Sequence, residues 1–225
     1  MPTVAESIIK FYTSLKPPRN LPEAVEILHP QAEEQVIEVV KTFYKKYYND
    51  NGPRQLLFGI NPGRFGAGTT GVNFTGPKQL TEFCHISHPF GKRSELSAEF
   101  IYDMINAYGG PEKFYSRFFI TSISPLGFVK EGINLNYYDD KALAAGIRPW
   151  IVDTIKKQLK FAGSSKKCIC IGGEKNYKYF SSINDELRFF SEIIPLPHPR
   201  FIMQYKRKQK STYIDAYLKA LDEII

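Results

Sequence analysis

Residues 55–74 read QLLFGINPGRFGAGTTGVNF, a short apolar run followed by a glycine-rich segment. The first six residues, QLLFGI, have the composition of a strand that is buried on both faces of a sheet. Three later runs share this character and are bounded by turn residues: FFITSI (118–123), KCICIG (167–172) and EIIPLP (192–197). Helical patterns separate the runs. This alternation predicts an α/β fold with three layers (α/β/α), in which helices cover a central, mainly parallel, four-stranded sheet.

The N-terminal part of the chain, about residues 1–50, is predicted to be helical. An amphipathic pattern over 3–15 ends at KPPRNLP, restarts briefly over 23–28, and is followed by a long helix over 31–48. Later helices are expected over 97–107, 141–161, 175–180 and 213–224, with the second broken near Gly146 and Pro149 and the last capped by Thr212 and Asp215. The length of 225 residues suits one domain spanning 1–225.

The charge balance is basic, with 30 Lys and Arg against 23 Asp and Glu, a net charge of +7 and a pI near 9.1. This balance favours a polyanionic partner, nucleic acid before membrane. A basic protein without such a partner explains the charge equally well. No run of 18 apolar residues occurs, so we expect no membrane-spanning segment. We also expect a monomer.

The three cysteines, Cys84, Cys168 and Cys170, do not have the number or spacing of a disulfide framework. Cys168 and Cys170 alternate within KKCICIGG, so we expect both on one face of a buried strand, without the second pair that a zinc or iron–sulfur site requires. The first residues, MPTVAESIIKFYTS, lack the basic start and apolar core of a signal peptide. We therefore expect an intracellular, reduced, cytoplasmic location.

Small or polar residues follow each predicted strand. They are Asn61-Pro62-Gly63, Ser122 to Pro125, Gly172-Gly173 and His198-Pro199-Arg200. Because open parallel sheets bind ligands at the carboxyl ends of their strands, we expect a ligand site at this edge.

The segment GAGTTG (66–71) matches the G-x-G-x-x-G pattern of dinucleotide-binding proteins. It begins six residues after the strand, however, and VNFTGPKQ follows it where the motif requires a helix. We instead interpret 59–74 as one irregular loop, with Asn61 at its start and Phe74 at its far end, where a ring can stack on a planar base. On these residues alone, a turn cap at Asn61 and a core role for Phe74 are equally good alternatives.

His198 lies within PLPHPR, where prolines on both sides stiffen the backbone. A lone histidine is more often structural than catalytic, but its place at a strand end beside Arg200 favours catalysis. No metal site is expected, because His85 and His88 lack a further ligand at metal spacing.

The run YKRKQK (205–210) lies shortly after His198 and suggests contacts with nucleic-acid phosphates, although a run of charges usually forms a solvated turn. Its basic residues are Lys206, Arg207, Lys208 and Lys210.

Over about residues 55–205, the chain resembles the single-strand-selective monofunctional uracil-DNA glycosylases of the uracil-DNA glycosylase superfamily. The family's first motif, G-M-N-P-G-P-F-G continuing to T-G-V-P-F-G, is matched by residues 59–66 and 70–74, and its second motif by His198, Pro199 and Arg200. The resemblance implies a DNA glycosylase of base excision repair that flips uracil or a related deaminated base from single- or double-stranded DNA, without a cofactor. It also implies association with the bacterial nucleoid.

The resemblance also implies residue roles. Asn61 would position the attacking water, His198 would stabilise charge on the departing base, and Phe74 would stack on that base. Gly63 would leave room for base and water, next to Ile60 in the same motif.

Two departures from the family pattern bear on specificity. Ser122 stands where the family has a base-reading Asn, which resembles a bacterial subgroup with broader substrates that include xanthine. Arg200 follows a shortened second motif, which weakens its assignment as the wedge that fills the vacated stack.

Lys206, Arg207 and Lys208 would contact the DNA backbone. A nucleotide-cofactor enzyme using the glycine-rich loop and a non-catalytic nucleic-acid-binding module are the alternatives.

Overall fold

A computed structural model describes residues 1–19, 21–162 and 166–225 and confirms the predicted three-layer α/β architecture. The central sheet has the strand order β3-β2-β6-β7, with every neighbouring pair parallel. A smaller antiparallel sheet has the order β1-β4-β5. The strands are β1 (Val25–Leu28), β2 (Gln55–Gly59), β3 (Phe118–Ser122), β4 (Gly127–Lys130), β5 (Ile133–Leu135), β6 (Lys167–Ile171) and β7 (Glu192–Leu196). The α-helices are α1 (Val4–Thr13), α2 (Glu34–Tyr47), α3 (Ala67–Thr70), α4 (Pro77–Glu82), α5 (Leu96–Tyr108), α6 (Pro111–Tyr115), α7 (Lys141–Ala162), α8 (Gly173–Leu187), α9 (Pro199–Tyr205) and α10 (Lys210–Glu223). Two 3-10 turns, η1 (Pro30–Ala32) and η2 (Arg207–Gln209), complete the elements.

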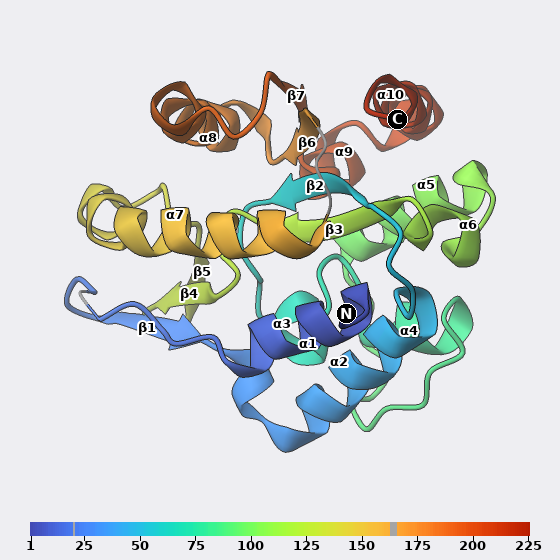
Figure 1. The fold of residues 1–225 in the computed structure, drawn as a ribbon, viewed down its shortest axis with the longest axis horizontal. Helices are drawn as coiled ribbons and strands as arrows, with labels where there is room; N and C mark the ends of the chain where they lie inside the picture. The colour runs from blue at the N-terminus through green and yellow to red at the C-terminus, as the bar shows by residue number, and fades with distance from the viewer. Residues whose placement is uncertain (20, 163–165) are drawn as a thin grey trace.

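Helices cover both faces of the central sheet, which Figure 1 shows close to edge-on. On one side lie α7 and α8, and Phe58 of β2 contacts Phe180 of α8 with ring centroids 4.9 Å apart. On the other side lie α5, α9 and α10, and Phe118 of β3 contacts Tyr108 of α5 at 5.3 Å. Helices α1 and α2 lie at the β3 end of the sheet. The apolar runs that predicted the strands are therefore buried on both faces, as a parallel sheet requires.

The strand register brings the carboxyl ends of the central strands level with one another. Gly59 pairs with Ser122 at the ends of β2 and β3, and Ile171 pairs with Leu196 at the ends of β6 and β7. The residues that follow these strands therefore gather at one edge of the sheet. Cys168 and Cys170 are free and fully buried within β6, as their alternation predicted.

One predicted helical segment and one predicted helix break are wrong. Residues 23–28 were expected to be helical, but Val25–Leu28 form β1 and pair with β4. A single helical turn has too few internal hydrogen bonds to compete with such pairing. The predicted break near Gly146 and Pro149 is absent, because α7 is one helix with Pro149 inside it. Pro149 removes one helical hydrogen bond, but four fully buried side chains on one face hold α7 against the core. They are Leu143, Ile147, Ile151 and Ile155.

Other boundaries also differ from the expectation. The last helix begins at Lys210, and no side chain caps it, so Thr212 and Asp215 lie inside the helix. The predicted 175–180 helix is α8, which spans Gly173–Leu187. The 59–74 loop contains the one-turn helix α3, and Pro77, in the segment expected to be non-helical, begins α4. Because α3 spans only four residues, it differs from the long helix of a dinucleotide-binding unit.

The small sheet, which the helix–strand pattern did not predict, supports the loop that follows β2. A side chain at Gly127 would place its Cβ 2.3 Å from the Pro62 carbonyl oxygen, so only glycine allows this contact between β4 and the loop. Leu28 of β1 also lies against Gly127. The small sheet thus holds the start of the loop in place.

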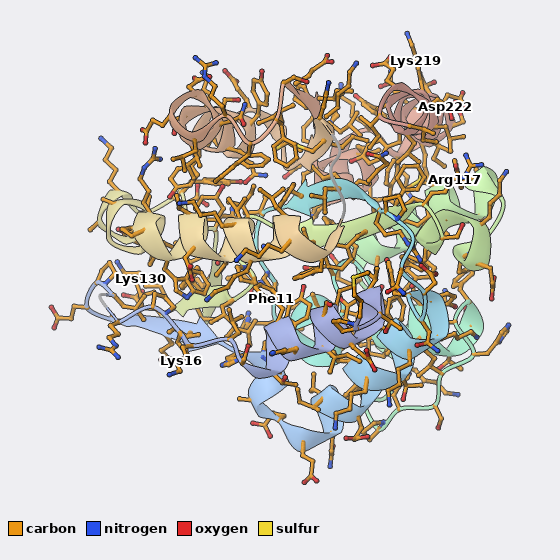
Figure 2. The ribbon with its side chains drawn as sticks, in the orientation of Figure 1. Phe11, Lys16, Arg117, Lys130, Lys219 and Asp222 are labelled. Atoms are coloured by element: carbon orange, nitrogen blue, oxygen red, sulfur yellow. The ribbon has the colours of Figure 1, made fainter. Side chains whose placement is uncertain are left out.

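Several charged side chains lie at the periphery. Figure 2 shows Lys219 and Asp222 on α10 and Lys130 on β4 at the outside of the molecule. Phe11, in contrast, points from α1 toward α7, where its ring centroid lies 5.6 Å from that of Phe161. Among the described helices, none combines the length and the apolar character that a membrane span requires.

The burial of one face of α7 predicts that shortening neighbouring side chains to alanine should destabilise the protein by unequal amounts. Ile151→Ala should lower the free energy of unfolding by about 2–5 kcal/mol, because it leaves a cavity in the core. Val152→Ala, at the next and only partly buried position, should cost clearly less. Urea denaturation measures both values. Equal losses would contradict the burial of this helix face.

Candidate active site

A cavity of about 420 Å³ opens at the carboxyl edge of the central sheet. Seven of the ten predicted site residues line it: Ile60, Asn61, Gly63, Phe74, Ser122, His198 and Arg200. These residues come from β3 and from the segments after β2 and β7, so the level strand ends bring together positions far apart in the sequence. The volume is in the range of pockets that hold small organic molecules, and one nucleobase fits that class.

The Asn61 side chain is held by the backbone around β5. Its Oδ1 accepts a hydrogen bond from the Tyr137 amide at 3.2 Å, and its Nδ2 donates to the carbonyl oxygens of Leu135 and Pro62, both at 3.3 Å. A backbone amide can only donate and a carbonyl can only accept, so these partners fix which end of the Asn61 amide is oxygen. One Oδ1 lone pair remains for a polar ligand in the cavity.

Phe74 is placed in the cavity by a strained turn. The Thr75 amide donates to the Val72 carbonyl at 3.2 Å, and Phe74 has a φ of +51° within this turn. Non-glycine residues rarely adopt that conformation. The ring lies directly on Gly59, where an added Cβ would sit 2.7 Å from the Phe74 ring. The His198 ring is 6.1 Å away between centroids, so a flat aromatic face and an imidazole border the same space.

His198 caps α9 with its side chain. Its Nδ1 accepts a hydrogen bond from the Arg200 amide at 3.1 Å. Because Nδ1 accepts, the proton of the neutral ring is on Nε2, which is left as a donor. Burial, and secondarily the positive charge of Arg200, lowers the pKa of His198 to about 4. The imidazole is therefore neutral at physiological pH.

Ser122 has a partner that the sequence did not reveal. Its Oγ donates to Oδ1 of Asn73 at 2.6 Å, and the Asn73 Nδ2 donates to the Tyr12 hydroxyl at 3.0 Å. Asn73 and Ser122 are only 7% and 2% exposed, yet both line the cavity. Asn73 was absent from the predicted site, although it stands where the resembling family's first motif has proline, and that departure was the available signal.

The cationic residues divide into two groups. Arg200 is exposed and lines the cavity, whereas Lys206, Arg207 and Lys208 do not line it. These three follow directly after Tyr205 at the cavity mouth and are exposed. Lys210, the last basic residue of the run, pairs with Asp103 at 2.9 Å. The structure thus places the basic run beside the cavity rather than within it.

Several further residues line the cavity but were not predicted from the sequence. Asn134, Asn136 and Tyr138 come from the small sheet and the segment after it, which the helix–strand pattern did not predict. Exposed aromatic rings at the mouth come from the loop after β2 and from α9: Phe65, Phe201 and Tyr205. Within the described ranges, no three His, Cys, Asp or Glu residues are grouped as a metal site would need.

Comparisons with known proteins identify the family of the chain. The family model described as the Uracil DNA glycosylase superfamily matches residues 45–222. The crystal structure of wild-type SMUG2 from Pedobacter heparinus is similar, with a TM-score of 0.95 and 43% sequence identity over 99% of this chain and 98% of that chain. A comparison with curated proteins found no match. The chain therefore belongs to the uracil-DNA glycosylase superfamily, and its general activity is that of a DNA glycosylase, a hydrolase of DNA repair.

Proposed function

We propose that this glycosylase is monofunctional and releases uracil and related deaminated bases, xanthine among them, from DNA. The observation that carries the proposal is that Asn61, His198 and Phe74 line one cavity, although the first two lie 137 positions apart in the sequence. We place the chain in the bacterial subgroup with serine at the base-reading position. It acts as a monomer on single- or double-stranded DNA, inside the cell at the nucleoid.

In the proposed reaction, the bond between C1′ and the base nitrogen breaks with its electrons leaving on the base. The sugar becomes oxocarbenium-like, and water then adds to C1′ and loses a proton to solvent. The base anion takes up one proton from solvent, leaving an abasic site and free base. The neutral His198 imidazole donates from Nε2 to a carbonyl oxygen of the departing base and stabilises its negative charge. No proton needs to be transferred from His198 itself, which suits a ring whose pKa lies near 4.

Asn61 holds the attacking water by orientation rather than as a base. Its Oδ1 has a free lone pair, and its amide is fixed by the Tyr137 and Leu135 backbone. An amide does not titrate near neutral pH, so its contribution is to place the water oxygen toward C1′. The oxocarbenium-like sugar is electrophilic enough to accept a weak nucleophile.

The target base must leave the DNA stack before it reaches the cavity, at a cost of a few kcal/mol. Stacking on Phe74 returns about 1–3 kcal/mol of this cost. Lys206, Arg207 and Lys208 contact DNA phosphates beside the cavity mouth. Arg200, exposed at the mouth, fills the vacated position in the stack.

The proposed role of Asn61 predicts the outcome of a base-release assay. The wild-type protein should release free uracil from a uracil-containing oligonucleotide in EDTA and leave the abasic strand uncut. Asn61→Ala should lower the single-turnover rate by at least about 100-fold, because the water is no longer oriented. DNA binding should change little, and the melting temperature should fall by only a few degrees as the three hydrogen bonds of the side chain are lost. Full activity of Asn61→Ala would remove this residue from the mechanism.

The role of His198 predicts a specific pH dependence. Folding lowers its pKa, so the neutral donor should persist as pH falls from 7 to 5 and be lost only as pH falls through about 4. NMR titration of the imidazole carbon-bound protons measures this value. Arg200→Ala should raise the pKa only partly, because burial is the larger cause. His198→Ala should cost about 100- to 1000-fold in rate. A His198 ring that is protonated at neutral pH in the wild type would contradict the neutral-donor mechanism.

The basic run predicts salt-dependent binding. Replacing Lys206 and Lys208 by alanine should weaken DNA binding and reduce the slope of log affinity against log salt by about 2, one for each lost phosphate contact. The control replaces Lys16 and Lys219 by alanine, which removes the same charge. These two lysines lie at the periphery, far apart from each other in Figure 2, and neither lines the cavity. An equal change in slope for both pairs would show that only net charge matters.

A further inference from the structure

We propose that Asn73 and Ser122 act as one unit that reads the edge of the flipped base, with Asn73 supplying the donor. This inference rests on the proposed function and names the residue that sets its specificity. Both side chains line the cavity, are almost fully buried, and are joined by a 2.6 Å hydrogen bond. Asn73 belongs to the loop after β2, and Ser122 ends β3. The unit therefore spans two segments that are distant in sequence.

The hydrogen bonds of the pair leave one donor and one acceptor for a ligand. Ser122 has a single hydroxyl hydrogen, which it donates to Asn73 Oδ1, so its Oγ can only accept from a third group. The Asn73 Nδ2 carries two hydrogens, and the Tyr12 hydroxyl takes one. In the part of the chain that the structure describes, no other hydrogen bond uses the second hydrogen.

This arrangement complements a deaminated base. Uracil, hypoxanthine and xanthine each present a ring N–H beside a carbonyl oxygen on the edge that pairs in a duplex. Ser122 Oγ can accept from that N–H, and Asn73 Nδ2 can donate to that oxygen. Cytosine and adenine present an unprotonated ring nitrogen beside an amino group, which reverses both roles. A polar group that meets a like group in a buried pocket is left unpaired, and this penalty gives discrimination.

The alternative is that Asn73 only ties its loop to α1 through Tyr12. A purely structural role would lower activity toward every base in the same proportion. A reading role would instead change the response to an altered base atom. The two are separated by changing the base carbonyl oxygen and the protein donor together.

The experiment compares single-turnover release of uracil and 4-thiouracil from otherwise identical oligonucleotides. Sulfur is a weak hydrogen-bond acceptor, so the uracil to 4-thiouracil rate ratio reports the donor that faces this atom. Asn73→Ala and the isosteric Asn73→Asp should each lower this ratio by at least about 5-fold relative to the wild type, as coupled pairs do. Val72→Ala, in the same turn but away from the cavity, is the matched control and should keep the wild-type ratio.

The uracil to 4-thiouracil ratio keeps the test decisive when a variant folds poorly, because the fraction of folded enzyme affects the release of both bases equally. If the wild type releases uracil and neither Asn73 variant changes the ratio, Asn73 does not read the base and the glycosylase proposal stands. If the wild type releases no base from any oligonucleotide, the proposed function fails, and this inference fails with it.

A reciprocal exchange tests whether the two residues are one unit. Ser122 lies against Asn73, so Ser122→Asn alone sets a second amide against the Asn73 amide, breaks the hydrogen bond between the two positions and should lower uracil release. Adding Asn73→Ser removes the competing amide and leaves a single amide, now at the strand end. The double variant should recover at least about 10-fold in rate over Ser122→Asn, within the range of couplings between contacting residues. No recovery would show that the two positions do not exchange one function.

Discussion

The site depends on the hydrogen bonds that tie the Asn61 side chain to the backbone of residues 135–137. The Tyr137 amide donates to Oδ1, and the Leu135 carbonyl accepts from Nδ2. These bonds cross from the small sheet and the residues after it to the loop after β2, and together with the Pro62 carbonyl they fix which end of the Asn61 amide is oxygen. Without them the amide could rotate or flip, and a water molecule could not be presented to a reacting carbon in one direction.

The other side chains of the site are also held in fixed orientations. The Arg200 amide sets the tautomer of His198, burial keeps its ring neutral, and Gly59 lets the Phe74 ring lie on the end of β2. Each is oriented by backbone rather than by flexible side chains. Such groups need little reorganisation when charge develops on a departing base, which is the property that makes preorganised polar sites effective. Asn73 differs from these residues because its partners are the hydroxyl groups of Ser122 and Tyr12. Its side chain also lines the cavity, where it can recognise a base.

Sequence patterns predicted the central sheet well and its surroundings poorly. Four apolar runs with polar residues at their ends were enough to expect a parallel sheet and a site that includes Asn61 and His198, because parallel strand ends share an edge. The small sheet was missed, since β1 and β5 have only four and three residues and are stabilised by pairing with β4 rather than by local pattern. Asn73 was missed for a related reason: its partners, Ser122 and Tyr12, are 49 and 61 residues away.

The central claim is that His198 and Asn61 act on one base held in this cavity. A crystal structure of the protein with an oligonucleotide carrying an uncleavable deoxyuridine analogue tests it most directly. We expect the uracil ring against Phe74, with His198 Nε2 within about 3.2 Å of a base carbonyl oxygen and a water on Asn61 Oδ1 facing C1′. A uracil bound outside the cavity, or a His198 ring with no contact to the base, would contradict it.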